Sequence, residues 1–211
     1  SNAIRGNAAE FGIVAAKGLG KVSGLLQRIA QDQALAENAR ESFVLLGARL
    51  AELNDQIAVI DLRLRAWHRN NECSQRLAAI PGIGQRIATS LTMKVSDPRG
   101  FRSGRHFSAW LGSTPKDHST AGKTRLGVIT RAGDEELRSM LVVGATAVIQ
   151  QVRKGRGPQW PWLVELLKRK PPKLAAVALA NKMARIAWKL MVSGESYQAD
   201  HHARPPMAKA A

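Results

Sequence analysis

The chain has 211 residues, of which 45% are hydrophobic, and a formal net charge of +16 at pH 7. This length suits one domain with an extended element, or two small domains. A single cysteine, Cys73, excludes a disulfide framework within the chain and a cysteine-based metal cluster. No apolar run approaches about 18 residues and no signal peptide is visible, so we expect a cytoplasmic protein that does not cross a membrane.

The positive charge is concentrated in the second part of the chain. Residues 1–70 contain 9 Lys/Arg and 7 Asp/Glu, whereas residues 71–211 contain 23 and 9. A surplus this large and this localised favours a polyanionic partner, above all nucleic acid. A basic ribosome-associated protein fits the same composition and is kept as an alternative.

The N-terminal part is expected to be helical. Residues 1–3, Ser-Asn-Ala, are typical of an expression scar, and we expect the chain to be a piece of a longer protein. Residues 4–35 have helical periodicity that several glycines interrupt, which predicts one or two short helices there.

A long helix is predicted over residues 37–69. Its apolar residues are spaced alternately four and three apart, as in a coiled-coil seam. They are Leu46, Leu50, Leu53, Ile57, Ile60, Leu64 and Trp67. A stripe this narrow suits one partner helix, either residues 4–35 folded back or a second copy of the chain. We predict that residues 4–70 form a coiled-coil region that makes a homodimer or a higher homo-oligomer.

The remaining residues predict a compact helical domain over 71–192. Its expected helices span 75–80, 85–94, 104–112, 135–153, 161–169 and 172–192. Residues 113–134 are rich in Gly, Ser, Thr, Lys and Arg and predict a long basic loop. The polar residues 193–211 are expected to be a disordered basic tail. The predicted fold class is therefore all-α, with a long antiparallel or coiled-coil arm before the compact domain.

The segment Ile80-Pro-Gly-Ile-Gly84 is predicted to be a turn between two short helices. Glycines permit a tight turn and a close approach of phosphate, and the next helix would point its N–H groups at that phosphate. This pattern resembles the helix-hairpin-helix motif, which grips the DNA backbone without reading its sequence. Pro81, Gly82, Gly84 and Arg86 are accordingly predicted DNA contacts. The alternative is a turn that only packs two helices together.

Three further cations, Lys182, Arg185 and Lys189, fall on one face of the last predicted helix. That face is predicted to contact DNA as well. No metal site is predicted in the chain. The carboxylates show no ligand spacing except at Asp134-Glu135-Glu136, and these residues suit the cap and first turn of a helix.

Phosphoryl transfer is the chemistry that residues 113–134 favour. Gly122-Lys123-Thr124 is superficially similar to a P-loop. The first glycine of that motif would fall at Asp117, so nucleotide binding is rejected. Ser119 or Thr120 could instead attack a DNA phosphodiester, with His118 moving a proton or orienting the serine. Lys123, Arg125 and Arg131 could stabilise the charge of the transition state. A phosphate-binding loop without catalysis is the alternative.

Read in chain order, these motifs resemble a known family. They are Pro81-Gly-Ile-Gly84, Phe101-Arg-Ser-Gly104, Phe107-Ser-Ala-Trp-Leu-Gly112, His118-Ser-Thr-Ala-Gly-Lys123, Arg125-Leu-Gly127 and Gly133-Asp134. The series resembles the C-terminal half of the insertion-sequence transposases that join a RuvC-like DEDD domain to a serine-bearing domain. These are the recombinases guided by a bridge RNA. The resemblance covers residues 4–192.

The resemblance implies a split active site. The serine that becomes joined to DNA falls in His118-Ser119-Thr120, with Ser119 preferred and Thr120 as the alternative. Ala121-Gly122 replaces the family's usual pair of glycines after it. The four acids and their Mg²⁺ belong to the RuvC-like domain, so no cofactor is expected in this fragment and it is expected to be inactive alone.

The implied partners are DNA, a structured guide RNA and further copies of the chain, in the nucleoid of a bacterial cytoplasm. A helix-hairpin-helix DNA-binding module with a coiled-coil arm and no chemistry of its own is the alternative function.

Overall fold

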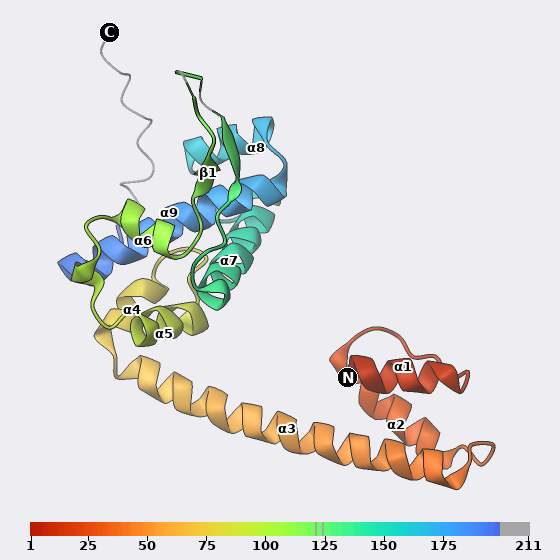
Figure 1. Cartoon of the computed structure of the whole chain (residues 1–211). Helices are drawn as coiled ribbons and strands as arrows, with labels where there is room; N and C mark the ends of the chain where they lie inside the picture. The colour runs from red at the N-terminus through yellow and green to blue at the C-terminus, as the bar shows by residue number, and fades with distance from the viewer. Residues whose placement is uncertain (121, 124, 199–211) are drawn as a thin grey trace. The chain divides into compact units, whose positions relative to one another are not determined.

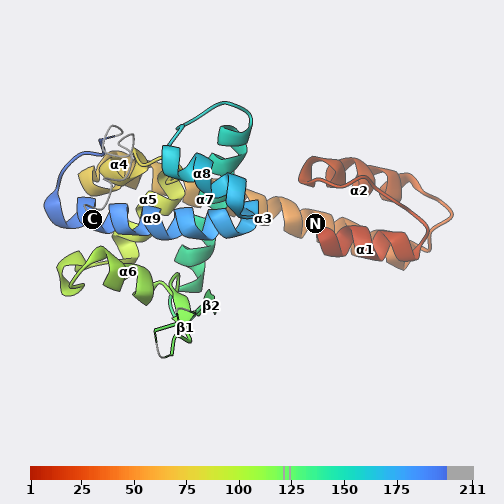
Figure 2. The same ribbon diagram turned by 90° about the horizontal axis from the view of Figure 1, so that it is seen from above.

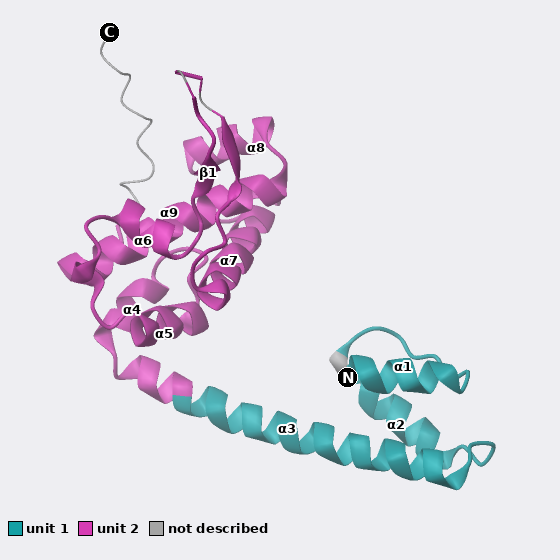
Figure 3. Cartoon of the chain, viewed as in Figure 1, with its two compact units in different colours: residues 1–63 teal, residues 64–211 magenta. Residues whose placement is uncertain are grey.

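The computed structural model, described here for residues 1–120, 122–123 and 125–198, is mostly helical (Figure 1). This confirms the predicted fold class. The chain forms two compact units, residues 1–63 and 64–211 (Figure 3). The long helix α3 (Glu37–Arg69) has the bounds that the heptad pattern predicts, and it contributes residues to both units.

The first unit is a small cluster of helices around the beginning of α3. The helices α1 (Asn2–Glu10) and α2 (Val22–Gln31), with the 3₁₀ turn η1 (Leu19–Lys21) between them, match the prediction for residues 4–35. Their shared core consists of Ile4, Ala8, Val22, Leu25, Ile29, Leu35 and Phe43. Gly47 brings α3 close to α2, because a Cβ there would lie 3.0 Å from Leu26 Cδ1.

The predicted coiled-coil seam on α3 is covered only in part within this unit. Leu50 packs against the core of the first unit. Four other residues of the seam, Leu46, Leu53, Ile57 and Ile60, are between 39% and 55% exposed. The folded-back residues 4–35 therefore do not account for the whole stripe among the described residues.

The second unit is built around a central helix. Its elements are α4 (Glu72–Ala78), α5 (Gln85–Lys94), η2 (Pro98–Gly100), α6 (Gly104–Trp110), β1 (Pro115–Asp117), β2 (Leu126–Ile129), α7 (Glu135–Arg153), α8 (Pro161–Arg169) and α9 (Pro172–Ser193). Helices α4, α6, α7 and α8 all pack on α9 (Figures 1 and 2). Many of the buried residues of α9 are alanines, and side chains this small let the surrounding helices approach its backbone closely.

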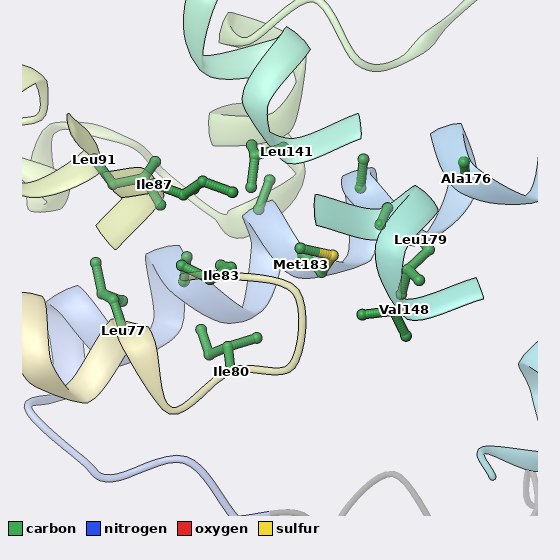
Figure 4. Close-up of a cluster of buried hydrophobic side chains, with 14 of the residues drawn as sticks. Leu77, Ile80, Ile83, Ile87, Leu91, Leu141, Val148, Ala176, Leu179 and Met183 are labelled. Carbon is green, nitrogen blue, oxygen red and sulfur yellow. The ribbon is translucent and has the colours of Figure 1, made fainter. Parts of the chain in front are cut away.

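The α4–α5 turn belongs to the core of the second unit. Ile80 and Ile83 in the turn are almost fully buried, and Figure 4 shows them among side chains of the neighbouring helices. These are Leu77 of α4, Ile87 and Leu91 of α5, Leu141 and Val148 of α7, and Ala176, Leu179 and Met183 of α9. Burial of these apolar side chains fixes the turn against α7 and α9.

A buried polar group fixes the end of α3 to α4 and α5. Asn71 caps α4 by accepting a hydrogen bond from the Ser74 amide. The fully buried Ser74 hydroxyl lies 2.7 Å from His68 Nδ1 and 3.4 Å from Thr89 Oγ1. Because each of these groups has a partner, the helix break at residues 70–71 is tied to the helix pair that follows.

Residues 113–134 differ from the predicted irregular loop, because they contain a β-hairpin. Strands β1 and β2 are antiparallel, with Pro115 opposite Ile129, Asp117 opposite Leu126 and an irregularity between the two pairs. The hairpin projects from the helices (Figure 1) and its strands are almost wholly exposed. Exposed strands of three and four residues lack the apolar alternation that predicts a strand.

Residues 194–198 lie against the second unit. Gly194 ends α9 with a φ of 74°, and its carbonyl oxygen accepts a hydrogen bond of 2.9 Å from Arg76. Glu195 pairs with Lys189 at 3.1 Å, and the half-buried Tyr197 packs on the core. The rest of the expected disordered tail, residues 199–211, lies outside the described residues.

Candidate functional site

The predicted DNA contacts of the α4–α5 turn lie in two parts of it. The inner part packs against other helices, and the outer part is exposed. Gly82 has a φ of +88°, which favours glycine. A Cβ at Gly82 would lie 2.8 Å from Met183 Cε and 3.0 Å from the Gly144 carbonyl oxygen. Gly144 in turn faces the Gly82 carbonyl oxygen so closely that a Cβ there would overlap it. Packing against α7 and α9 is thus sufficient to require a glycine at position 82.

The outer part of the turn is Gly84 with the start of α5. Gly84 is the exposed N-cap of this ten-residue helix, and a Cβ there would meet no atom within 4 Å. It supplies no side chain to cap the first N–H groups of α5, which leaves these donors to other acceptors. Arg86 is exposed two residues further on. Pro81 is half-buried beside Gly82.

Packing and buried hydrogen bonds hold the base of the β-hairpin. Gly112, with a φ of 67°, lies so close to residues 131–133 that a Cβ would be 2.8 Å from the Ala132 amide nitrogen. The buried Arg138 donates to the carbonyl oxygens of Leu111, at 3.0 Å, and Gly133, at 3.3 Å. Asn181 of α9 donates to the Ser113 carbonyl oxygen at 3.1 Å. The exposed hairpin thus extends from a base that these contacts hold in place.

Ser119 is held by its neighbours at the far end of the hairpin. Its amide donates to Asp117 Oδ1 at 2.8 Å, and its hydroxyl oxygen accepts from the Arg125 amide at 3.0 Å. Hydrogen bonds from the Ser119 side chain and then from its amide lower the pKa of Asp117 below its usual value. The Asp117 carboxylate, bonded to the Ser119 amide, is thus the acidic group next to an exposed serine hydroxyl.

Asp117 is a site residue that the sequence motifs missed. Its only signal in the sequence is an Asp two residues before the candidate serine, a spacing typical of an Asx-turn. The same spacing occurs in many loops without chemistry, so it does not mark a catalytic group.

The structure brings the other predicted residues of the hairpin together. The His118 ring covers Gly127, where a Cβ would lie 3.0 Å from His118 Nε2. His118 and Arg125 line an open cavity of about 520 Å³. Thr120 is joined to Lys123 by a backbone hydrogen bond of 3.0 Å. Arg131, with a φ of 58°, is exposed at the base of the hairpin.

Lys182, Arg185 and Lys189 line a different surface. They face a pocket of about 960 Å³ between α6, α8, α9 and residues 195–198. No described residue of the hairpin lines this pocket. The structure therefore separates the predicted cations into a hairpin group and an α9 group.

The carboxylates at the start of α7 have a structural role. Asp134 caps α7 by accepting from the Leu137 amide at 2.9 Å, as predicted, and Lys94 bridges Asp134 and Glu136. Hydrogen bonds to Glu136 and Asp134 raise the pKa of Lys94. Burial raises the pKa of Asp134, but the hydrogen bonds from Leu137 and Lys94 lower it by more. The net result is a pKa below the usual value.

Two features are absent from the described residues. They contain no group of three His, Cys, Asp or Glu side chains placed to hold a metal ion. No described helix has the length and apolar character needed to span a bilayer.

Comparison with known proteins finds a family match within the second unit. Residues 74–158, from α4 through the hairpin and α7, match the family described as "Transposase IS116/IS110/IS902 family". This part of the chain is therefore similar to the domain that the transposases of that family share.

Curated relatives that align with more than nine-tenths of the chain are also named transposases. The chain is 63% identical over 199 residues to the "Putative transposase y4pF/y4sB" of Sinorhizobium fredii, covering 94% of this chain and 51% of that protein. It is 37% identical to the "Probable family 20 transposase" of Pseudomonas aeruginosa, with 93% and 59% covered. It is 34% identical to the "Transposase for insertion sequence element IS1111A" of Coxiella burnetii, with 93% and 55% covered. The chain spans about half the length of the curated relatives it matches.

Proposed function

We propose that this chain is the DNA-joining half of an insertion-sequence transposase, and that Ser119 is its nucleophile. The observation that carries the proposal is the exposed Ser119 hydroxyl, held between the Asp117 carboxylate and the Arg125 amide. Names of relatives that cover 93–94% of the chain support the transposase part of the proposal.

The proposed reaction is an in-line displacement at a DNA phosphodiester. A bond forms between Ser119 Oγ and phosphorus, and the bond from phosphorus to the leaving sugar oxygen breaks. Asp117 accepts the proton of the attacking hydroxyl, and the leaving oxygen takes a proton from solvent. Lys123 and Arg125 stabilise the negative charge that builds on the phosphoryl oxygens. His118 orients the hairpin strand from its position over Gly127.

The DNA backbone is proposed to lie across the outer part of the α4–α5 turn. Phosphate would be bound by the N–H groups at the start of α5, which have no side-chain cap, and by Arg86 and Arg131. In this helix-hairpin-helix-like arrangement Gly82 shapes the turn from inside and Gly84 meets the DNA. Such contacts carry no base information, which agrees with the proposal that a guide RNA selects the target.

A second copy of the chain is the proposed partner of the exposed seam on α3. Leu53, Ile57 and Ile60 repeat at heptad positions and are exposed in the single chain. Packing them against the same residues of a second α3 would bury a continuous apolar stripe, as in a coiled coil. The magnesium-binding acids that the resemblance implies are proposed to belong to a RuvC-like domain outside this chain.

A trapped protein–DNA adduct tests the nucleophile. The full-length transposase is incubated with a DNA substrate that carries the element's end, the covalent product is digested, and the modified peptide is identified by mass spectrometry. We expect the adduct on Ser119, its loss in Ser119→Ala and its retention in the matched variant Thr120→Val. An adduct mapped to Thr120 would move the nucleophile by one residue.

The alternative function is a DNA-binding module without chemistry of its own, and the same experiment separates the two. Tight, salt-dependent DNA binding with no adduct at either hydroxyl under conditions that support transposition would favour the module. The isolated chain is expected to bind DNA and to cut no strand. Strand cleavage by the isolated chain that Ser119→Ala abolishes would contradict the split active site.

A further inference from the structure

The pocket beside α9 has features that the backbone grip and the hairpin do not use. We call it the basic pocket, and it lies between α6, α8, α9 and residues 195–198, with a volume of about 960 Å³. The cations and tryptophans that line it are Arg105, Trp162, Lys182, Arg185, Trp188 and Lys189. All of them belong to the second unit.

Positive charge in the basic pocket is poorly compensated. Lys182, Arg185 and Lys189 share one face of α9, and Arg105 of α6 lies across from them because Gly104 lets α6 approach Arg185 closely. Glu195 is the one carboxylate among the described lining residues, and it pairs with Lys189. Burial and then the neighbouring Arg185 lower the pKa of Lys182. A bound anion would relieve this unbalanced charge.

Aromatic rings line the same cavity. The Lys182 ammonium lies 4.1 Å from the centroid of the Trp162 ring. Trp160, which does not line the pocket, stacks on Trp162 with 6.3 Å between centroids. Trp188 is fixed by a hydrogen bond of 2.8 Å from its Nε1 to the Pro98 carbonyl oxygen. Tyr197 lies at the side formed by residues 195–198. Rings next to cations are the combination that binds a flat base together with its phosphate.

The size of the pocket decides which form of nucleic acid fits. A volume of about 960 Å³ is at the upper end of the roughly 300–1,000 Å³ of small-ligand pockets. A double helix is too wide to enter and can touch only the rim. A single nucleotide outside a duplex can enter, as bases do in enzymes that extrude them.

We propose that the basic pocket binds an unpaired nucleotide of a single strand, with its phosphate on Arg185 and Arg105 and its base against the tryptophan wall. This inference rests on the nucleic-acid part of the proposed function and is independent of Ser119. It gives the second unit a second nucleic-acid contact, which is specific for unpaired strands.

Fluorescence anisotropy on the 211-residue chain tests the proposal. Labelled oligonucleotides of about 12 nucleotides are compared as oligo-dT, oligo-rU, a duplex and an abasic strand with the same phosphates. Arg185→Glu is the test variant. Lys173→Glu is its matched control, because Lys173 is exposed on the same helix and does not line the pocket.

We expect Arg185→Glu to weaken single-strand binding about tenfold or more and Lys173→Glu to weaken it only about threefold or less. Duplex binding should fall equally in both variants. The abasic strand should bind at least about fivefold more weakly than oligo-dT. Tighter binding of oligo-dT or of oligo-rU identifies DNA or RNA as the source of the nucleotide.

Two outcomes would overturn the proposal. Equal effects of the two variants on single strands would mean that the pocket is not the binding site. Equal affinity for the abasic strand and oligo-dT would mean that only phosphate is bound. If the unmodified chain does not bind the duplex, the proposed contact of the α4–α5 turn with the DNA backbone is wrong. A preference for single strands that depends on Arg185 would still support the pocket.

Discussion

Replacing each glycine of the α4–α5 turn with alanine separates packing from DNA binding. Gly82→Ala places a methyl group 2.8 Å from Met183 Cε and 3.0 Å from the Gly144 carbonyl oxygen, at a φ of +88°. The left-handed backbone costs about 1–2 kcal/mol and overpacking about 1–3 kcal/mol. The lower entropy of the unfolded alanine chain returns about 0.4–1 kcal/mol. We therefore expect a net loss of about 2–4 kcal/mol.

Gly84→Ala is the matched control within the same turn. A Cβ there meets no atom within 4 Å and the φ of −75° suits any residue, so we expect a change in stability within about 1 kcal/mol. Its effect should instead appear in DNA binding, because the added methyl group stands where phosphate is proposed to approach α5. Under conditions in which Gly82→Ala is folded, it should change DNA affinity less than Gly84→Ala does.

Urea denaturation followed by tryptophan fluorescence measures these changes. The tryptophans at 67, 110, 160, 162 and 188 all lie in the second unit, so the signal follows that unit alone. A shift of the midpoint at constant slope reports a change in stability. If Gly82→Ala unfolds at the same urea concentration as the unmodified chain, close packing against α7 and α9 does not require a glycine at position 82.

Four further predictions concern other parts of the chain. Asp117→Asn should slow adduct formation by about 10²–10⁴-fold, as loss of a general base does, while Asp117→Glu should keep part of the rate. The pKa of Asp117 is lowered in the fold, so the stabilisation that its carboxylate gives the hairpin is present above about pH 4. This stabilisation is lost as the pH falls through the lowered pKa. Adduct assays below and above that range will show the loss. Leu53→Asp with Ile60→Asp should give monomers in analytical ultracentrifugation, whereas an unchanged mass would mean that the stripe packs within one chain. Arg138→Met should cost about 1–3 kcal/mol in urea denaturation, because the buried carbonyl oxygens of Leu111 and Gly133 lose their donor.

Long periodic segments were the most predictable part of the fold. The heptad spacing in α3 and the proline starts of α8 and α9 define helices from local signals, and the structure has helices at those residues. The Asp134 cap was predictable for the same reason. The hairpin was not, because its strands are short and exposed, and they are held by Gly112, Arg138 and Asn181, whose contacts are far apart in sequence.

The candidate site was predictable in its residue types but not in their grouping. Ser119, His118 and Arg125 could be selected because hydroxyl, imidazole and guanidinium groups suit phosphoryl transfer. The role of Asp117 depends on a local backbone turn that brings its carboxylate to the Ser119 amide. The inward position of Gly82 depends on α7 and α9, which lie at least 50 residues away in sequence. The spacing of glycines alone does not distinguish packing from a phosphate contact.

The exposed hairpin also makes this domain suitable for division into two chains. A cut at Lys123 or Arg125 would fall after α6 and before α7, in a segment whose strands are exposed. Helices α4 and α6 from the first piece pack on α9 from the second, so the pieces would remain joined by a shared apolar core. A trypsin-nicked protein should therefore elute as one species on gel filtration. The same position offers a site where the proposed function could be made dependent on bringing two half-proteins together.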